Sequence, residues 1–447
     1  MAFVPVKKLL LSMGLPMIFS MMLQALYNIV DSAFVANMKG NGEAALNALT
    51  LAFPVQMLMV AIGIGTGVGV NAMIARCLGQ KDTEQASRTA GNAVFLGIVI
   101  YAVFLLFGLF GTDIYVKSQT SNTEIIDMAS SYLKICCTAS FGIVFFSLYE
   151  KMIQATGRSL YSTIAQVTGA VLNMILDPIM IYGLLGFPTL GVNGAALATV
   201  IGQIASFALG LFFHMKYNKE IKNGLHYAKP DKRIIKKIYA IGVPAIIAQA
   251  LMSFMTYALN IIFGMVDERI VTAYGLYYKI QQFILFAAFG LRDAITPIVS
   301  FSYGKGDKKR IKDGIRYGLF DTLFIMVLGM ILLEIFANVL TGLFGLSGET
   351  AALCVSAIRI ISLSFLFAGA NVAMQGCFQA LESGIPSLII SVLRQFLFVI
   401  PVAYSFALII NKNRAPEWML WITFLIAESI TCVIAALLLK KVIKKKV

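Results

Sequence analysis

Apolar residues dominate long stretches of this chain, and short polar segments separate these stretches. The stretches cover residues 9–35, 48–74, 90–112, 129–153, 161–183, 191–213, 236–264, 270–302, 317–343, 352–380, 386–409 and 418–439. A helix of roughly 20 apolar residues crosses the hydrocarbon layer of a bilayer, which is about 30 Å thick. Strands of a membrane barrel would instead alternate apolar and polar positions in segments of about 10 residues. The pattern therefore predicts twelve membrane-spanning helices.

The polar and helix-breaking residues of the first six stretches return in the last six. The equivalent pairs are Gly14 and Gly242, Pro16 and Pro244, Gly79-Gln80-Lys81-Asp82 and Gly304-Lys305-Gly306-Asp307, Gln154 and Gln379, and Pro178 and Pro401. They are 223 to 228 residues apart, whereas solenoid repeats have periods of about 20 to 50 residues. Because each half has an even number of spans, both halves run the same way through the membrane. We expect an all-α integral membrane protein with two parallel six-helix bundles, related by pseudo-two-fold symmetry around a central cavity.

This duplication predicts the domain boundaries. We expect an N-terminal six-helix lobe at 1–215, a basic cytoplasmic linker at 216–233, and a C-terminal six-helix lobe at 234–447. The linker is long enough for one lobe to rock against the other.

Composition supports a membrane protein. Hydrophobic residues make up 59% of the chain, charged residues 13%, and the mean hydropathy is +0.83, against about 45–50% apolar and 25% charged residues in soluble domains. The formal net charge of +14 reflects topology, since 26 of the 36 Lys and Arg residues fall on the side of both termini and six on the opposite side. Positive residues collect on the cytoplasmic side, so both termini are expected there. No basic soluble domain exists to bind nucleic acid.

Several kinds of catalytic or metal site are not indicated. The six Cys residues form no C-x-x-C pattern, and the two His residues, His214 and His226, both lie near the linker. No phosphate-binding G-x-x-x-x-G-K-[ST] motif occurs. A membrane enzyme would need clustered nucleophiles, acid–base pairs or metal ligands, so we expect no enzyme, no cofactor and no metal beyond a possible Na⁺.

The most informative residues are acids inside the spans, because an Asp at the centre of a membrane helix costs about 2.5–3.5 kcal/mol on insertion scales. Asp31 shares a helical face with Tyr27 and Gln24. Asn173 and Asp177 are four residues apart and also share a face. Pro178 follows directly, and its missing N–H predicts a kink that frees a carbonyl. This set of oxygens suits Na⁺, and a desolvated carboxylate suits H⁺ equally well.

The second half keeps the proline and loses the acids. Asn260 lies near the position equivalent to Asp31, and Ile400 precedes Pro401. This asymmetry favours a specialised ion site in the first half over carboxylates that are merely tolerated polar anchors. Four further charged residues of the second half, Glu334, Glu428, Arg359 and Arg394, could pair with one another across helices.

Taken together, these stretches resemble the multidrug and toxic compound extrusion (MATE) family, and within it the DinF-like and MepA-like bacterial branches. The resemblance covers nearly the whole chain and is carried by the Gly-x-Pro opening, Tyr27-Asn-Ile-Val-Asp31, Gln154-Ala-Thr-Gly-Arg158, Asn173-x-x-x-Asp177-Pro178 and Gly194-Ala-Ala-Leu-Ala-Thr199. It implies a cation site at Asp31, Asn173, Asp177 and Thr199, with Ala195 nearby. It also implies that Gln24 and Tyr27 face the substrate cavity. NorM-like members add acids in the seventh and tenth spans, where this chain has Asn260 and Asn371.

The expected function is a secondary antiporter that exports organic, cationic and amphipathic compounds in exchange for H⁺ or Na⁺ by alternating access. Its expected partners are small-molecule substrates and membrane lipids, and we expect a functional monomer that crosses the bacterial cell membrane many times. The nearest alternative is a lipid-linked saccharide flippase of the same superfamily. A flippase would favour cationic residues along its cavity, and the spans of the first half hold no mid-span Arg or Lys.

Overall fold

The computed structural model describes residues 1–38, 42–343, 348–412 and 415–447. Lys39 and Arg414, two of the six basic residues expected on the outer side, lie outside these residues. The helices of the first half are α1 (Val6–Ala36), α2 (Gly42–Gly79), α3 (Thr83–Phe110), α4 (Thr112–Lys117), α5 (Thr123–Thr138), α6 (Phe141–Ala155), α7 (Ser159–Tyr182), η1 (Leu184–Gly186), α8 (Val192–Tyr217) and η2 (Leu225–Ala228). Those of the second half are α9 (Lys232–Gly264), α10 (Glu268–Lys305), α11 (Lys308–Leu343), α12 (Gly348–Ser362), α13 (Phe365–Ala380), α14 (Gly384–Val392), the π-helix η3 (Leu393–Leu397), α15 (Val399–Asn411) and α16 (Met419–Lys446).

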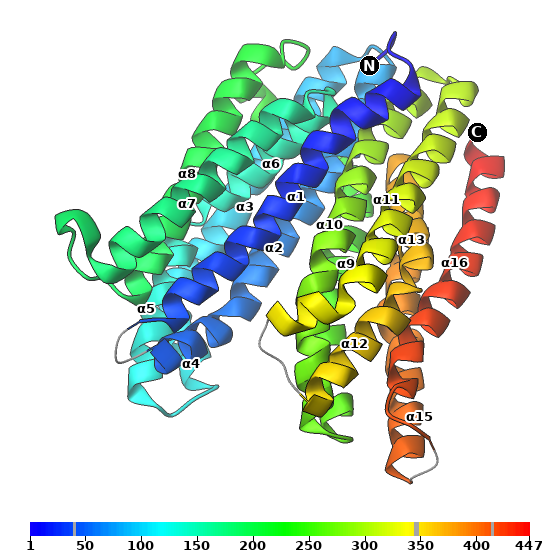
Figure 1. Cartoon of the computed structure of the whole chain (residues 1–447). Coiled ribbons are helices and arrows are strands. Elements are labelled where there is room, and N and C mark those ends of the chain that lie inside the picture. The colour runs from blue at the N-terminus through cyan, green and yellow to red at the C-terminus, as the bar shows by residue number, and fades with distance from the viewer. Residues whose placement is uncertain (39–41, 344–347, 413–414) are drawn as a thin grey trace. The chain divides into compact units, whose positions relative to one another are not determined.

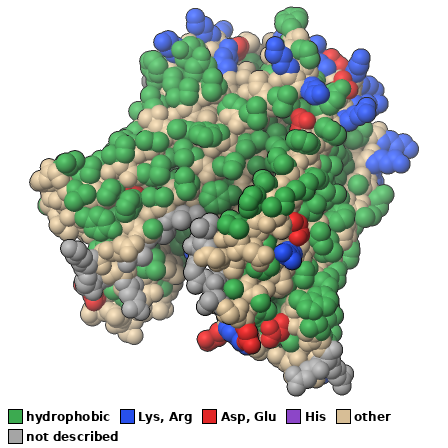
Figure 2. Space-filling model, viewed as in Figure 1, with side chains coloured by type: hydrophobic (Ala, Val, Ile, Leu, Met, Phe, Trp, Pro, Cys, Tyr) green, Lys and Arg blue, Asp and Glu red, His purple; other side chains and the backbone are tan. Residues whose placement is uncertain are grey.

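The predicted all-α membrane fold is confirmed. Within the described ranges, ten helices are long and apolar enough to cross a membrane, and the number becomes twelve when two bent pairs each count as one span. The described residues contain no β-strand. Figure 2 shows hydrophobic side chains over the middle of the helices in each unit, with Lys and Arg gathered near helix ends.

The two bent spans are a repeated feature that the apolar pattern did not predict. The axis turns by 45° between α5 and α6 and by 51° between α12 and α13. A serine, Ser140 or Ser364, lies directly before the second helix of each pair, and these serines are 224 residues apart. The duplication therefore preserves this bend as well as the spans.

The repeated polar loops start helices in the same way. The carboxylate of Asp82 accepts a hydrogen bond from the backbone N–H of Gln85 (2.8 Å), at the start of α3. Asp307, its equivalent, accepts from the backbone N–H of Arg310 (3.0 Å), at the start of α11. Such side-chain caps satisfy N–H groups that have no partner within the helix, which gives the sequence repeat a local structural role.

Packing divides the chain into two compact units. Unit 1 comprises Met1 and Phe19–Ile246, and unit 2 comprises Ala2–Ile18 and Ile247–Val447. The first part of α1 therefore packs within unit 2, and the first part of α9 packs within unit 1. Both long helices change unit two residues after a proline, Pro16 or Pro244.

The two exchanged segments pack through equivalent small residues. In unit 1 a Cβ on Gly65 of α2 would lie 2.3 Å from Cγ1 of Ile246, so only glycine fits against α9 there. In unit 2 a Cβ on Gly290 of α10 would lie 2.7 Å from the backbone N of Ile18. Small residues that let two helix backbones approach are typical of membrane helix packing.

The linker at 216–233 is held against α3 by hydrogen bonds. The backbone N–H of Lys222 donates to Ser87 Oγ (2.8 Å), and the Tyr227 hydroxyl donates to Glu84 Oε2 (2.9 Å). Asn92 donates to the carbonyl of Lys229 and accepts from the N–H of Asp231. The linker thus belongs structurally to unit 1.

Candidate functional site

A buried polar cluster inside the spans of unit 1 lies between α7 and α8. Nδ2 of Asn173 lies 3.3 Å from Oδ1 of Asp177, one turn along α7, and 3.4 Å from Oγ1 of Thr199 on α8. Asn173 and Asp177 are fully buried. The amide is therefore a donor shared between a carboxylate and a hydroxyl, and it holds the three groups together.

Glycines bring these two helices close enough for that contact. α7 and α8 lie side by side (Figure 1). A Cβ on Gly202 of α8 would lie 2.6 Å from the carbonyl oxygen of Gly169 and 3.1 Å from Cβ of Asn173. A Cβ on Gly194 would lie 2.4 Å from the carbonyl oxygen of Met180. Because neither position has room for a side chain, the backbones meet directly and fix the spacing between Asn173 and Thr199.

Asp31 of α1 supplies the second carboxyl group. Its side chain is close enough to Asp177 for the two carboxyl groups to interact electrostatically. Oδ1 of Asp31, Oδ1 of Asn173 and Oδ2 of Asp177 are all buried and make no hydrogen bond with any described residue. Buried acceptors without donors are costly. A bound cation or an added proton would satisfy them, so the cluster fits either ion.

Three other polar residues of α1, Ser20, Gln24 and Tyr27, lie near polar groups of α7. Nε2 of Gln166 donates to Oε1 of Gln24 (3.1 Å), and the Ser20 hydroxyl donates to Oε1 of Gln166. The Tyr27 hydroxyl lies near the carboxyl groups of both Asp31 and Asp177. The structure thus places Tyr27 beside the carboxyl groups, whereas Gln24 bonds to α7 one to two turns away from them.

Two other residues named from the sequence have a supporting position. Ala195 lies on α8 one turn before Thr199 and is fully buried in the hydrophobic core beside Val192 and Ile181. Pro178 lies inside α7, which continues unbroken from Ser159 to Tyr182. The cluster therefore depends on the facing of α1, α7 and α8 and needs no broken helix.

Three polar residues near Asp31 were missed from the sequence. Nε2 of Gln56 on α2 donates to the Tyr132 hydroxyl (3.0 Å) and to Cys136 Sγ (3.8 Å), both on α5. Both side chains lie near the carboxyl group of Asp31. Gln56 is a polar residue within an apolar stretch, and that isolation is the one signal the sequence offered.

Unit 2 has a different polar cluster, built around an internal ion pair. Nη2 of Arg394 lies 2.6 Å from Oε1 of Glu428, and Nδ2 of Asn371 donates to Oε2 of the same carboxylate (2.8 Å). All three residues are buried. The expected pairing of charges is thus confirmed for Arg394 and Glu428. It is wrong for the other two, because Glu334 accepts instead from the Ser362 hydroxyl (2.9 Å), and Arg359 makes no ion pair with any described residue.

Asp293 is a buried acid in the eighth span that the sequence analysis overlooked. It pairs with its neighbour Arg292 on α10, with Nη2 and Oδ1 2.8 Å apart. The guanidinium also lies over the ring of Phe289, 4.9 Å from its centroid. Adjacent opposite charges in an apolar stretch were the available signal.

Comparison with known proteins gives concordant results. The family model described as MatE matches residues 16–179 and again 244–405, once in each half of the duplication. The Multidrug export protein MepA of Staphylococcus aureus (strain MRSA252) is 27% identical over 435 residues, which is 97% of this chain and 93% of the relative. MepA of Staphylococcus saprophyticus is 24% identical over 95% of this chain and 91% of the relative.

Solved structures agree on the fold. A MATE protein in complex with MaL6 superposes with a TM-score of 0.92 at 24% identity, covering 99% of this chain and 97% of that one. A MOP superfamily transporter from Pyrococcus furiosus superposes with a TM-score of 0.89 at 24% identity, covering 99% and 96%. The family model covers most of the chain in two equivalent segments, and from this match we conclude that the protein belongs to the MatE family.

Proposed function

We propose that this protein is a secondary antiporter that exports organic, cationic and amphipathic compounds in exchange for H⁺ or Na⁺ by alternating access. The single observation that carries the proposal is the set of three buried, unpaired oxygens at Asp31, Asn173 and Asp177. The relatives named multidrug export protein support the export of several compounds. In this proposal the chain is a transporter and has no catalytic role.

The ion site is proposed to consist of Asp31, Asn173, Asp177 and Thr199, with Ala195 as its apolar wall. Two carboxyl groups held close together in a low-dielectric surrounding repel each other when both are charged. A Na⁺ ion between them, or a proton on one of them, removes that repulsion and satisfies the unpaired oxygens. Gln24 and Tyr27 extend the polar face of α1 toward the proposed substrate cavity.

The lobes are proposed to be residues 1–215 and 234–447, joined by the linker at 216–233, with both termini in the cytoplasm. The distribution of Lys and Arg supports this orientation. We further propose a monomer in the bacterial cell membrane. One charge moved across 100 mV yields about 2.3 kcal/mol, so a one-for-one exchange supports only modest accumulation.

The experiment is efflux of a fluorescent organic cation from proteoliposomes under an inward H⁺ gradient and, separately, an inward Na⁺ gradient. We expect one gradient or both to drive efflux in the wild type, and Asp31→Asn and Asp177→Asn to abolish it. Asp113→Asn is the matched control, because Asp113 is an exposed acid of the same unit on α4.

Two results would overturn the proposal. If both site variants insert normally and export as well as the wild type, the carboxylates do not couple ion and substrate. If no gradient drives efflux from correctly inserted wild-type protein, the result favours the flippase alternative. Lipid-linked saccharides would then be the substrates to test.

A further inference from the structure

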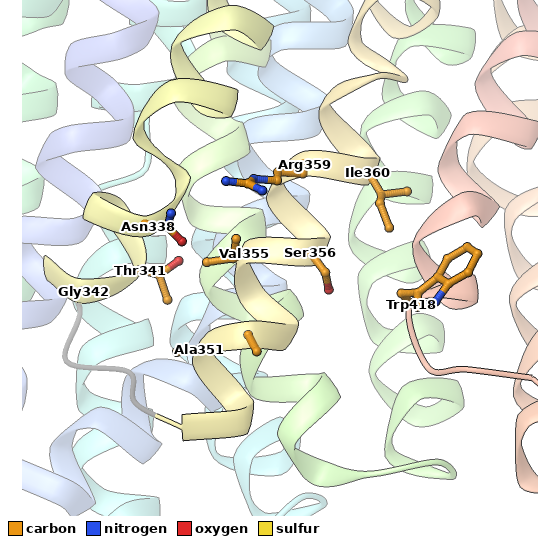
Figure 3. A pocket seen from close by; sticks show the side chains of 10 residues that line it. Asn338, Thr341, Gly342, Ala351, Val355, Ser356, Arg359, Ile360 and Trp418 are labelled. Atoms are coloured by element: carbon orange, nitrogen blue, oxygen red, sulfur yellow. The ribbon is translucent and has the colours of Figure 1, made fainter.

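A second polar site lies in unit 2, remote in sequence from the proposed ion site. A cavity of about 820 Å³ opens between the end of α11, the face of α12 and the start of α16 (Figure 3). Its walls are mainly apolar, with Val355, Ile360 and Trp418 among them. Arg359 and Asn338 bring polar groups into the same space, as Figure 3 shows.

Arg359 is an exposed cation within a membrane-spanning pair of helices. It lies on α12, which with α13 forms one bent apolar span. None of the described residues forms an ion pair with it. The nearby carboxylate of Glu334 accepts from the Ser362 hydroxyl. Arg394, by contrast, is buried and bonded to Glu428. A charge at membrane depth is costly unless it is paired or reaches water, so an unpaired guanidinium there calls for an anionic partner.

Asn338 adds a second free donor beside the guanidinium. Its side-chain amide makes no hydrogen bond with any described residue, and it lies one turn before Thr341 on the wall that α11 contributes. Among the described residues that line the cavity, none carries a carboxylate. A planar guanidinium with an amide N–H next to it matches the oxygens of a phosphodiester.

The surroundings of the cavity point to a lipid as the source of that phosphodiester. Side chains of α11 next to the cavity are large, apolar and outward-facing, with Ile335 65% and Val339 57% exposed. Trp418 at the start of α16 is 46% exposed, and Trp is typical of the level of the lipid headgroups. An apolar rim of this kind faces acyl chains and not water.

The depth of Arg359 is compatible with a headgroup. Arg359 is eleven residues past Gly348, and at 1.5 Å per residue α12 advances about 16 Å over that distance. Because α12 is bent by 51° from α13, the advance along the direction of α13 is only about 10 Å. The long side chain of Arg can span part of that distance toward the interface.

We propose that this cavity binds the headgroup of an anionic phospholipid of the membrane, with its phosphodiester on the Arg359 guanidinium and the Asn338 amide. An acyl chain then lies along Val355 and the exposed side chains of α11. The site is independent of the proposed transport function, because it shares no residue with the cluster at Asp31 and Asp177. Its test can therefore fail while the transport proposal stands.

The test uses Trp418 as a local reporter. The full-length protein is reconstituted in phosphatidylcholine vesicles, and quenching of Trp fluorescence by brominated phosphatidylglycerol is compared with quenching by brominated phosphatidylcholine at equal mole fractions. The chain has two Trp residues, and Trp421 is fully buried. Trp418→Phe therefore measures the background signal.

We expect the wild type to favour the anionic lipid about tenfold, the factor that corresponds to about 1.4 kcal/mol and to one charge-assisted contact. Arg359→Gln should abolish that preference, Arg359→Lys should retain part of it, and Asn338→Ala should weaken it. Lys412→Gln is the matched control, because it removes an exposed charge elsewhere in unit 2 and should leave the preference unchanged.

Three results would overturn the inference. Equal quenching by both lipids in the wild type would show that no anionic site exists. An unchanged preference in Arg359→Gln would place the lipid elsewhere. Loss of the preference on adding millimolar glycerol phosphate would identify a site for small soluble anions and not for lipid. A gel-filtration profile matching the wild type confirms that each variant is folded.

Discussion

Gly67 of α2 lies against Lys151 of α6 so closely that a Cβ on the glycine would come within 2.7 Å of Cγ of the lysine. Unit 2 has the same arrangement with the partners exchanged. Arg292 of α10 takes the position of Gly67, and Gly376 of α13 takes the position of Lys151, each 225 residues further along. A Cβ on Gly376 would lie 2.9 Å from Cγ of Arg292. Each unit thus has one cation and one glycine at this helix contact, supplied by opposite helices.

This exchange predicts that the cation can be moved from one helix to the other in unit 1. Gly67→Arg alone should reduce stability and transport, because two long cations would compete for one space. Lys151→Gly alone should also reduce both, because the ammonium that donates to Gln154 Oε1 (3.0 Å) is lost. The double variant Gly67→Arg, Lys151→Gly reproduces the arrangement of unit 2 and should recover at least half of wild-type efflux.

Melting temperature in detergent and efflux from proteoliposomes measure both effects. A double variant that is worse than either single variant would show that the contact tolerates a cation on only one helix. Lys151→Met separates the loss of charge from the loss of helix propensity that glycine brings.

The close contact of α7 and α8 predicts that alanine at one glycine of α8 lowers stability and ion binding, whereas alanine at another does not. Gly202→Ala places a methyl group 2.6 Å from the carbonyl oxygen of Gly169, so the helices must separate and carry Thr199 away from Asn173. We expect a loss of about 1–3 kcal/mol in stability, as for overpacked cores, together with weaker ion binding.

Gly210→Ala is the control, because its Cβ would meet its nearest neighbour, Phe146, at an ordinary 3.6 Å. It should unfold at the wild-type temperature and bind the ion equally well. Ion-dependent shifts of the melting temperature measure both variants. Equal behaviour of Gly202→Ala and the wild type would show that helix spacing does not set the ion site.

The ion pair of unit 2 predicts that a single variant loses more stability than the double variant. Arg394→Met leaves the buried Glu428 carboxylate with Asn371 as its remaining partner, and breaking a buried pair costs about 3–5 kcal/mol. Arg394→Met combined with Glu428→Met removes both charges and should restore most of the loss. Thermal unfolding of the three proteins measures the coupling, and additive losses would show that the two side chains do not depend on each other.

The docked linker predicts an acid-sensitive attachment to unit 1. Nη2 of Arg158 lies 2.8 Å from Oε1 of Glu220. Partial burial alone would raise the pKa of Glu220, but the hydrogen bonds and charge of Arg158 lower that pKa below its usual value of 4.5. The pair therefore stabilises docking above about pH 4.5, and its contribution is lost as the pH falls through the lowered pKa.

Hydrogen exchange of residues 218–224, corrected for intrinsic rates, measures this attachment. Exchange should accelerate in Arg158→Gln at pH 7, and the wild type should approach that variant as the pH falls below 4.5. Lys219→Gln, at an exposed neighbour, should exchange like the wild type. If Arg158→Gln exchanges no faster, the docking depends on Ser87 and Asn92 and not on the ion pair.

The sequence predicted the features that follow from composition and local spacing. Apolar runs identified the spans, and the repeated loop ending at Asp82 and Asp307 identified the duplication. The four-residue spacing of Asn173 and Asp177 placed them on one face, as their hydrogen bond requires. These features depend on neighbouring residues along one helix, which a sequence displays directly.

Other features depend on contacts between distant segments, which local spacing along the sequence does not predict. The bends at Ser140 and Ser364 lie inside stretches that the apolar pattern shows as single spans. The approach of Asp31 to Asp177 was implied by family resemblance alone, and the contribution of Gln56 and Tyr132 was not foreseen. The sequence does not show against which helix glycines such as Gly169 and Gly202 pack.

The exchange of helix ends between the two units has a consequence for the order of assembly during synthesis. Gly14 of α1 packs on Leu291 of α10, so the N-terminal part of α1 reaches its neighbour only after α10 has been synthesised. Conversely, a fragment that stops at the linker lacks the beginning of α9, which covers Gly65 in unit 1. Each half of the duplication therefore needs a helix segment from the other half to complete its own packing.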